Sequence, residues 1–78
     1  MDWKEKAKED FAHRLLELVA EHEQRTGSKL SLRQLAAKSN LEYSHVQRIT
    51  KAQVDLALTT ILALASGLER PAKDLLDF

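Results

Sequence analysis

Apolar side chains recur every three or four residues along most of this chain, and that spacing is the strongest constraint on its fold. In the first third, the repeat lines one face of a helix that should end near Gly27. This apolar face comprises Trp3, Ala7, Phe11, Leu15, Leu18, Val19 and His22. Residues that interrupt helices are few, with two glycines and one proline in 78 residues. No strand-like alternation of apolar and polar residues occurs. We therefore predict an all-α fold.

Local signals predict further helices after Gly27, which suits the positive φ that often follows a helix C-terminus. Ser31 has the side chain of an N-cap and precedes a short apolar helical period. A third helix is expected from about residue 42 to residue 50. A fourth should cover residues 58–68, where leucine, isoleucine and alanine recur.

A last short helix is expected near the C-terminus. Pro71 can open it as its first helical residue, since proline lacks only an N–H that would be unpaired there. Leu75 and Leu76 are expected to face inward. The prediction is thus a compact domain of five helices, in which residues 1–10 form a polar extension of the first helix.

The second and third helices have the pattern of a helix-turn-helix. Ala36 is the small residue where the two helices cross, and Asn40 can adopt the left-handed conformation that turns the chain. The shared apolar floor is Leu35, Leu41, Val46 and Ile49. This arrangement leaves Tyr43, Ser44, Gln47 and Arg48 directed away from the core.

Charge is unevenly distributed although the net charge is zero. Residues 1–25 carry five basic and seven acidic side chains, residues 26–54 carry five and one, and residues 55–78 carry two and four. The positive charge therefore lies in the predicted helix-turn-helix, and a local patch of this kind is enough to contact phosphates. Chance clustering on a solvated face is the alternative.

Several functional classes have no support in the sequence. Cysteine is absent, no apolar run approaches a membrane span, and no signal peptide precedes the domain, so a cytoplasmic location is expected. His13, His22 and His45 lack the spacing of a metal site, and we predict neither a metal nor a cofactor. No nucleotide-binding or nucleophile motif occurs, so an enzyme is not expected.

The runs SLRQLAAKSNLEYSHVQRI and TTILALASGLERPAKDLLDF resemble the Cro/C1-type helix-turn-helix family, also called the Xre family. The resemblance extends from about Leu15 to the C-terminus. It implies a lambda-repressor-like fold over residues 11–78, double-stranded DNA as the partner, and a two-fold dimer. Leu32 stands where the family often has Gln, Thr50 where it has an acidic residue, and Ala52 where it has Gly.

The resemblance also implies roles for the side chains on this surface. Tyr43 and Ser44, at the start of the third helix, would enter the major groove of DNA, although packing of Tyr43 over a neighbouring helix is an alternative. Gln47 and Arg48 would reach base edges or phosphates, because Gln matches adenine and Arg matches guanine. An ordinary solvated arginine is the alternative for Arg48. The remaining DNA-binding candidates are Arg33, Lys38 and Lys51 as phosphate contacts and His45 beside them.

The expected function is that of a transcriptional regulator of the repressor type, a homodimer on a pseudo-palindromic operator. Leu68, Leu75, Leu76 and Phe78 are candidates for the dimer interface, with completion of the monomer core as the alternative. Two other functions fit the sequence. One is the antitoxin of a toxin–antitoxin pair, with the acidic flanks holding a basic toxin. The other is a helical protein-interaction bundle without DNA affinity, which Glu42 and Leu32 would favour.

Overall fold

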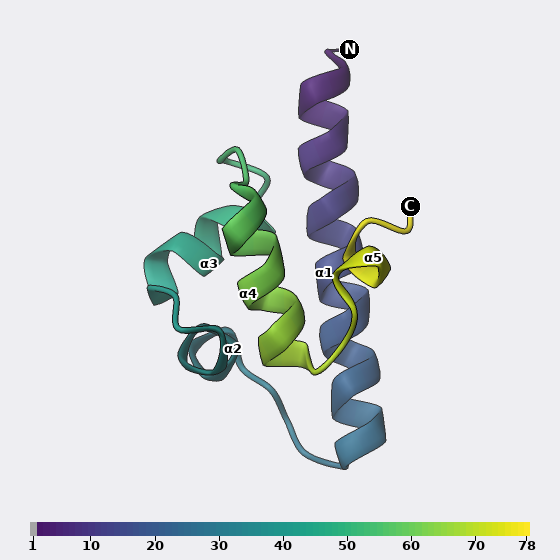
Figure 1. Cartoon of the computed structure of the whole chain (residues 1–78), viewed down its shortest axis with the longest axis vertical. Coiled ribbons are helices and arrows are strands. Elements are labelled where there is room, and N and C mark those ends of the chain that lie inside the picture. The colour runs from purple at the N-terminus through teal and green to yellow at the C-terminus, as the bar shows by residue number, and fades with distance from the viewer. Residues whose placement is uncertain (1) are drawn as a thin grey trace.

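The long first helix sets the length of the molecule. In the computed structural model, which describes residues 2–78, α1 (Trp3–Thr26) begins after Asp2, whose side chain accepts a hydrogen bond from the Lys4 backbone N–H. It ends at Gly27, with φ of 73°. Twenty-four residues rise about 36 Å, close to the longest molecular extent of 38 Å. The first turns of α1 project beyond the other helices (Figure 1).

The next two helices form the predicted helix-turn-helix. Helix α2 (Leu32–Ser39) starts with a capping box, in which Ser31 and Gln34 each bond the other's backbone N–H. It ends at Asn40, whose φ of 55° confirms the predicted left-handed turn. Helix α3 (Tyr43–Thr50) follows after only three residues and has Glu42 at its N-cap.

Two helices complete the described chain. Helix α4 (Leu58–Leu68) ends at Glu69 in a left-handed conformation, and α5 (Ala72–Leu75) is a single turn. Pro71 is the N-cap of α5 rather than its first helical residue, so the predicted boundary is wrong by one position. In Figure 1, α2 and α3 lie on the side of α4 away from α5.

The apolar faces of all five helices meet in one core. Its fully buried side chains are Leu15, Leu18, Leu35, Val46, Ile49, Leu64, Leu68 and Leu75. Helix α2 packs most extensively against α4. At this crossing Gly67 lies so close to Ser39 that a Cβ on Gly67 would overlap the Ser39 hydroxyl oxygen. The helix-turn-helix is therefore braced from behind by α4.

The expectation that Leu75 and Leu76 both face inward is correct only for Leu75. Leu76 is 52% exposed, because it follows a helix of one turn and adjacent helical positions point about 100° apart. Trp3, assigned to the apolar face of α1, is 73% exposed because the first turns of that helix extend past the core. No helix in residues 2–78 is long and apolar enough to cross a membrane.

Ala52 supplies a first test of this architecture. Its φ is 58°, and the following residue, Gln53, donates its backbone N–H to Arg48 O at 3.0 Å to close the end of α3. A side chain in this left-handed region costs about 1–2 kcal/mol, which glycine does not incur. We expect Ala52→Gly to raise the free energy of unfolding by about 1 kcal/mol in urea titrations, after allowing for the greater freedom of glycine in the unfolded chain.

The matched control is Ala37→Gly, at an exposed position inside α2. That change should lower the free energy of unfolding by about 1 kcal/mol, because glycine is a poor residue in a helix. Destabilisation by both substitutions would contradict the left-handed turn at Ala52.

Candidate nucleic-acid interface

Helix α3 is held by one face and presents the other to solvent. Val46 and Ile49 are buried in the core, with 0% and 2% of their surface exposed. Ser44 and Arg48, on the opposite side of the helix, are exposed. The apolar period of α3 therefore orients its polar side chains outward, as the sequence predicts.

The eight predicted DNA-binding residues are all at least partly accessible. Five are exposed, namely Arg33, Lys38, Ser44, Arg48 and Lys51. Three are half-buried, namely Tyr43, His45 and Gln47. All eight belong to α2, to α3 or to the residue that follows α3, and the two helices are in contact.

The cations of this surface are free of internal ion pairs. Arg33, Lys38, Arg48 and Lys51 form no salt bridge within residues 2–78. Outside this surface, four of the eight other basic residues each pair with at least one carboxylate. These are Lys6, Lys8, Arg14 and Arg70. The helix-turn-helix thus retains its positive charge for an external anion.

Arg70, one of these paired basic residues, bonds two carboxylates. Its guanidinium donates to Glu21 at 2.8 Å and to Asp74 at 3.1 Å, and these hydrogen bonds raise the pKa of Arg70 above its ordinary value. Arg14 donates to the backbone oxygen of Asp74 at 2.7 Å. Both arginines therefore join α1 to the C-terminal segment and are not available to a ligand.

Three of the predicted residues touch one another. The Arg33 guanidinium lies over the Tyr43 ring, 4.2 Å from its centroid, and so links α2 to α3. Gln47, one turn after Tyr43, donates from Nε2 to the Tyr43 hydroxyl at 3.0 Å. Tyr43 itself packs against the hydrophobic core, so the expectation that it is directed away from the core is wrong. The sequence identified all three residues but did not predict these contacts.

Glu42 lies directly before the first residue of α3. It occupies the N-cap position of α3, but its side chain makes no capping hydrogen bond. The exposed carboxylate lies in a shallow hollow with His45 and Arg48, near the positive end of the helix dipole. It remains the one acidic side chain of residues 26–54.

Two further residues refine the surface. Leu32, where the family often has Gln, is half-buried against the core and contributes to the scaffold. Lys29 was not among the predicted site residues, yet it is exposed and lines a groove together with Lys38. Its charge within the basic segment was the available signal. No group of three or more potential metal ligands occurs in residues 2–78.

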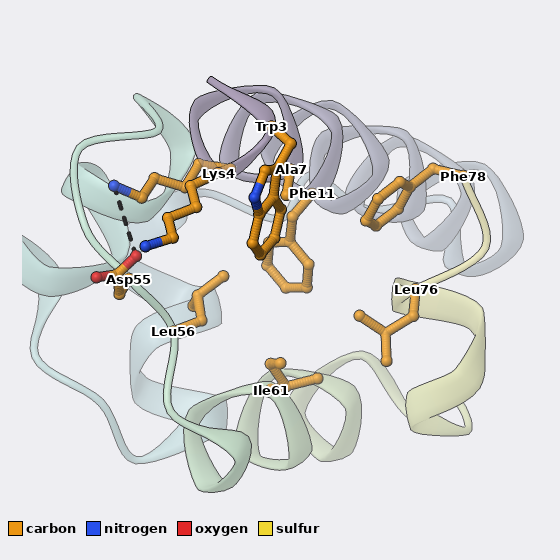
Figure 2. Close-up of a pocket in the computed structure, with 10 residues that line it drawn as sticks. Trp3, Lys4, Ala7, Phe11, Asp55, Leu56, Ile61, Leu76 and Phe78 are labelled. Atoms are coloured by element: carbon orange, nitrogen blue, oxygen red, sulfur yellow. Dashed lines mark ion pairs between the residues drawn. The ribbon is translucent and has the colours of Figure 1, made fainter. Parts of the chain in front are cut away.

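A second surface lies where the start of α1 meets the C-terminus. Figure 2 shows an apolar groove of about 370 Å³ between the start of α1, the segment that precedes α4, and the C-terminus. Its apolar lining is Trp3, Ala7, Phe11, Leu56, Ile61, Leu76 and Phe78. Leu76 and Phe78 are 52% and 59% exposed.

Of the four candidate dimer residues, two are buried and two line the groove. Leu68 and Leu75 have no exposed surface, because they fill the space between α1, α4 and α5. They belong to the monomer core and cannot contact a second protomer through their side chains. Leu76 and Phe78 remain accessible.

Comparison with known proteins supplies an independent result. No protein-family model matches the chain, and no curated protein sequence matches it. Among solved structures, it is similar to the crystal structure of the restriction-modification controller protein C.AhdI from Aeromonas hydrophila. The TM-score is 0.72 at 31% sequence identity, over 87% of this chain and 94% of C.AhdI.

This agreement extends over nearly the whole of the compared protein, in sequence as well as in fold. Over residues 2–78, this chain has five helices, a capped α2, a left-handed turn at Asn40 and an outward-facing α3. The chain belongs to the Cro/C1-type helix-turn-helix family.

Proposed function

We propose that this chain is a sequence-specific double-stranded DNA-binding protein that regulates transcription. The observation that carries the proposal is the solvent-facing side of α3, flanked by cations without internal ion pairs. Phosphate contacts fix the register of a protein on DNA, and side chains in the major groove read the bases. The similarity to a controller protein supports a regulatory role.

Seven of the eight predicted residues contact DNA directly in this proposal. Arg48 and Gln47 read base edges in the major groove, with Ser44 beside them at the start of α3. Arg33, Lys38 and Lys51 hold phosphates on either side, and His45 adds a contact at the edge. The proposal assigns the chain no catalytic step, cofactor or metal, and it places the chain in the cytoplasm with its DNA.

The regulator acts as a repressor-type homodimer in this proposal. Two copies of α3 would occupy successive major grooves, about 34 Å apart, on a pseudo-palindromic operator. A selection from random duplexes tests the whole proposal. It should enrich a two-fold symmetric sequence, whereas recovery without enrichment would refute sequence-specific binding.

The apolar groove is the proposed dimer surface. Trp3, Leu76 and Phe78 expose more than half of their surface around one depression, and a two-fold interface requires a self-complementary patch. In this arrangement residues 11–78 form the DNA-binding unit, and the first turns of α1 contribute to association.

Deletion of residues 76–78 should therefore yield a monomer in light scattering or sedimentation. Helix α5 and the buried Leu75 stay in place, so the fold should persist by circular dichroism. The matched control is Leu16→Gln, an exposed leucine of α1 outside the groove, which should leave the molecular mass unchanged. An unchanged mass after the deletion would refute this surface.

We give the antitoxin alternative less weight than DNA binding. That interpretation needs the acidic flanks to be free for a basic toxin, but many of their carboxylates already pair within the chain. Internally paired carboxylates are Glu5, Asp10, Glu17, Glu21, Asp55 and Asp74. A protein-interaction bundle has one observation in its favour, the uncapped carboxylate of Glu42 beside Arg48. The duplex selection distinguishes it from a DNA-binding protein.

A further inference from the structure

We propose that Tyr43 is a positioning residue, which holds Arg33 ready for a phosphate and Gln47 ready for a base instead of reading DNA itself. This inference rests on the proposed DNA binding. It starts from the place of Tyr43, the first residue of α3, half-buried and packed against the core. Tyr43 is therefore a rigid platform between the two short helices.

The first contact involves the face of the ring. Arg33 comes from α2 and stacks over Tyr43 at 4.2 Å from the centroid. Stacking engages the guanidinium plane through a cation–π interaction and leaves the N–H edges free. Those edges match phosphate oxygens in a bidentate geometry. Arg33 has no carboxylate partner in residues 2–78 that would compete for them.

The second contact involves the hydroxyl group. Gln47 Nε2 donates one of its two N–H groups to Tyr43 Oη at 3.0 Å. One N–H and the amide oxygen of Gln47 remain unused by this bond. A donor next to an acceptor is the pair that matches N7 and N6–H of adenine in the major groove. The Tyr43 hydroxyl thus fixes the orientation of the amide without consuming its recognition groups.

Both contacts are present in the protein without DNA. A long side chain that is already ordered loses less conformational freedom on binding, so pre-organisation raises affinity without adding a contact to DNA. Tyr43 would then control specificity through Gln47 and affinity through Arg33. The two effects depend on different parts of Tyr43, the hydroxyl and the ring face.

Tyr43→Phe separates these parts, because it removes the hydroxyl and keeps the ring. With the full-length chain and the selected duplex, we expect it to weaken binding about three- to tenfold, equivalent to about 0.7–1.4 kcal/mol. The preference at one base pair should fall, and it should be the same base pair at which Gln47→Ala loses discrimination. Affinity for an unrelated duplex and the salt dependence should not change, since Arg33 remains stacked.

A double-mutant cycle completes the test. Tyr43→Phe should have no further effect in the Gln47→Ala background, because the hydroxyl acts only through the amide. Wild-type discrimination by Tyr43→Phe would overturn the inference, and so would an equal loss on every duplex, which would indicate a direct phosphate contact. Absence of any salt-dependent duplex binding by the wild-type chain would instead overturn the proposed function, and this inference with it.

Discussion

Substitution of Arg48 by alanine is expected to weaken binding to the selected duplex by about 5- to 150-fold for each half-site. Arg48 is exposed, forms no ion pair within residues 2–78, and lies one turn after Ser44 on the outward face of α3. A guanidinium in that place can bond O6 and N7 of guanine together, and loss of such a bidentate pair costs about 1–3 kcal/mol. Fluorescence anisotropy at constant salt measures the change.

The matched control for this prediction is Lys73→Ala. Lys73 is an exposed cation of α5 without an ion pair in residues 2–78, and α5 contacts α1 and α4 rather than the helix-turn-helix. Its removal changes the net charge equally and should weaken binding little. Arg14 is a poor control, because its guanidinium bonds Asp74 O and helps to hold the fold. Equal losses from Arg48→Ala and Lys73→Ala would show that α3 is not the binding face.

The largest expected effect on stability comes from Gly67→Ala. A methyl group there would overlap the Ser39 hydroxyl and lie 3.2 Å from the Ser39 backbone nitrogen, so α2 and α4 would have to separate. Overpacking of this kind costs about 1–3 kcal/mol, more than the gain of up to about 1 kcal/mol from replacing a helical glycine. We expect a lower urea midpoint and weaker DNA binding, because α4 supports α2.

A second substitution identifies the cause. Within residues 2–78 the buried Ser39 hydroxyl has no hydrogen-bond partner, so Ser39→Ala alone should be neutral or stabilising. Combined with Gly67→Ala, it should recover part of the lost stability, because the overlapping atom is gone. The matched control is Ser66→Ala, an exposed neighbour in α4, which should change stability by less than about 0.5 kcal/mol. Additive effects of the two core substitutions would contradict the close approach.

Features determined by a few adjacent residues were predictable from the sequence. Gly27, Ser31 and Asn40 have side chains or conformational freedom that act within one turn of a helix, and all three adopt the predicted conformations. The outward face of α3 was predictable for a related reason. Burial of Val46 and Ile49 fixes the rotation of a helix of only eight residues.

Features that depend on how helices meet were not predictable. An apolar period identifies the buried face of a helix but does not say where its neighbour ends, so Leu75 and Leu76 could not be told apart. The sequence placed a small residue, Ala36, where α2 and α3 cross, but it did not identify the close approach of Gly67 in α4 to Ser39 in α2. The contact of Arg33 with Tyr43 depends on the crossing angle of α2 and α3, which no local signal encodes.

The salt dependence of duplex binding is the most direct test of the central claim, that α3 and its flanking cations face a phosphate backbone. Each protomer offers three to four free cations, from Arg33, Lys38, Arg48 and Lys51, to phosphates. Displacement of counterions by these groups predicts that the logarithm of the binding constant falls linearly with that of salt concentration, with a slope of about −5 to −7 for a homodimer. A slope near zero, or no duplex binding at low salt, would contradict the account.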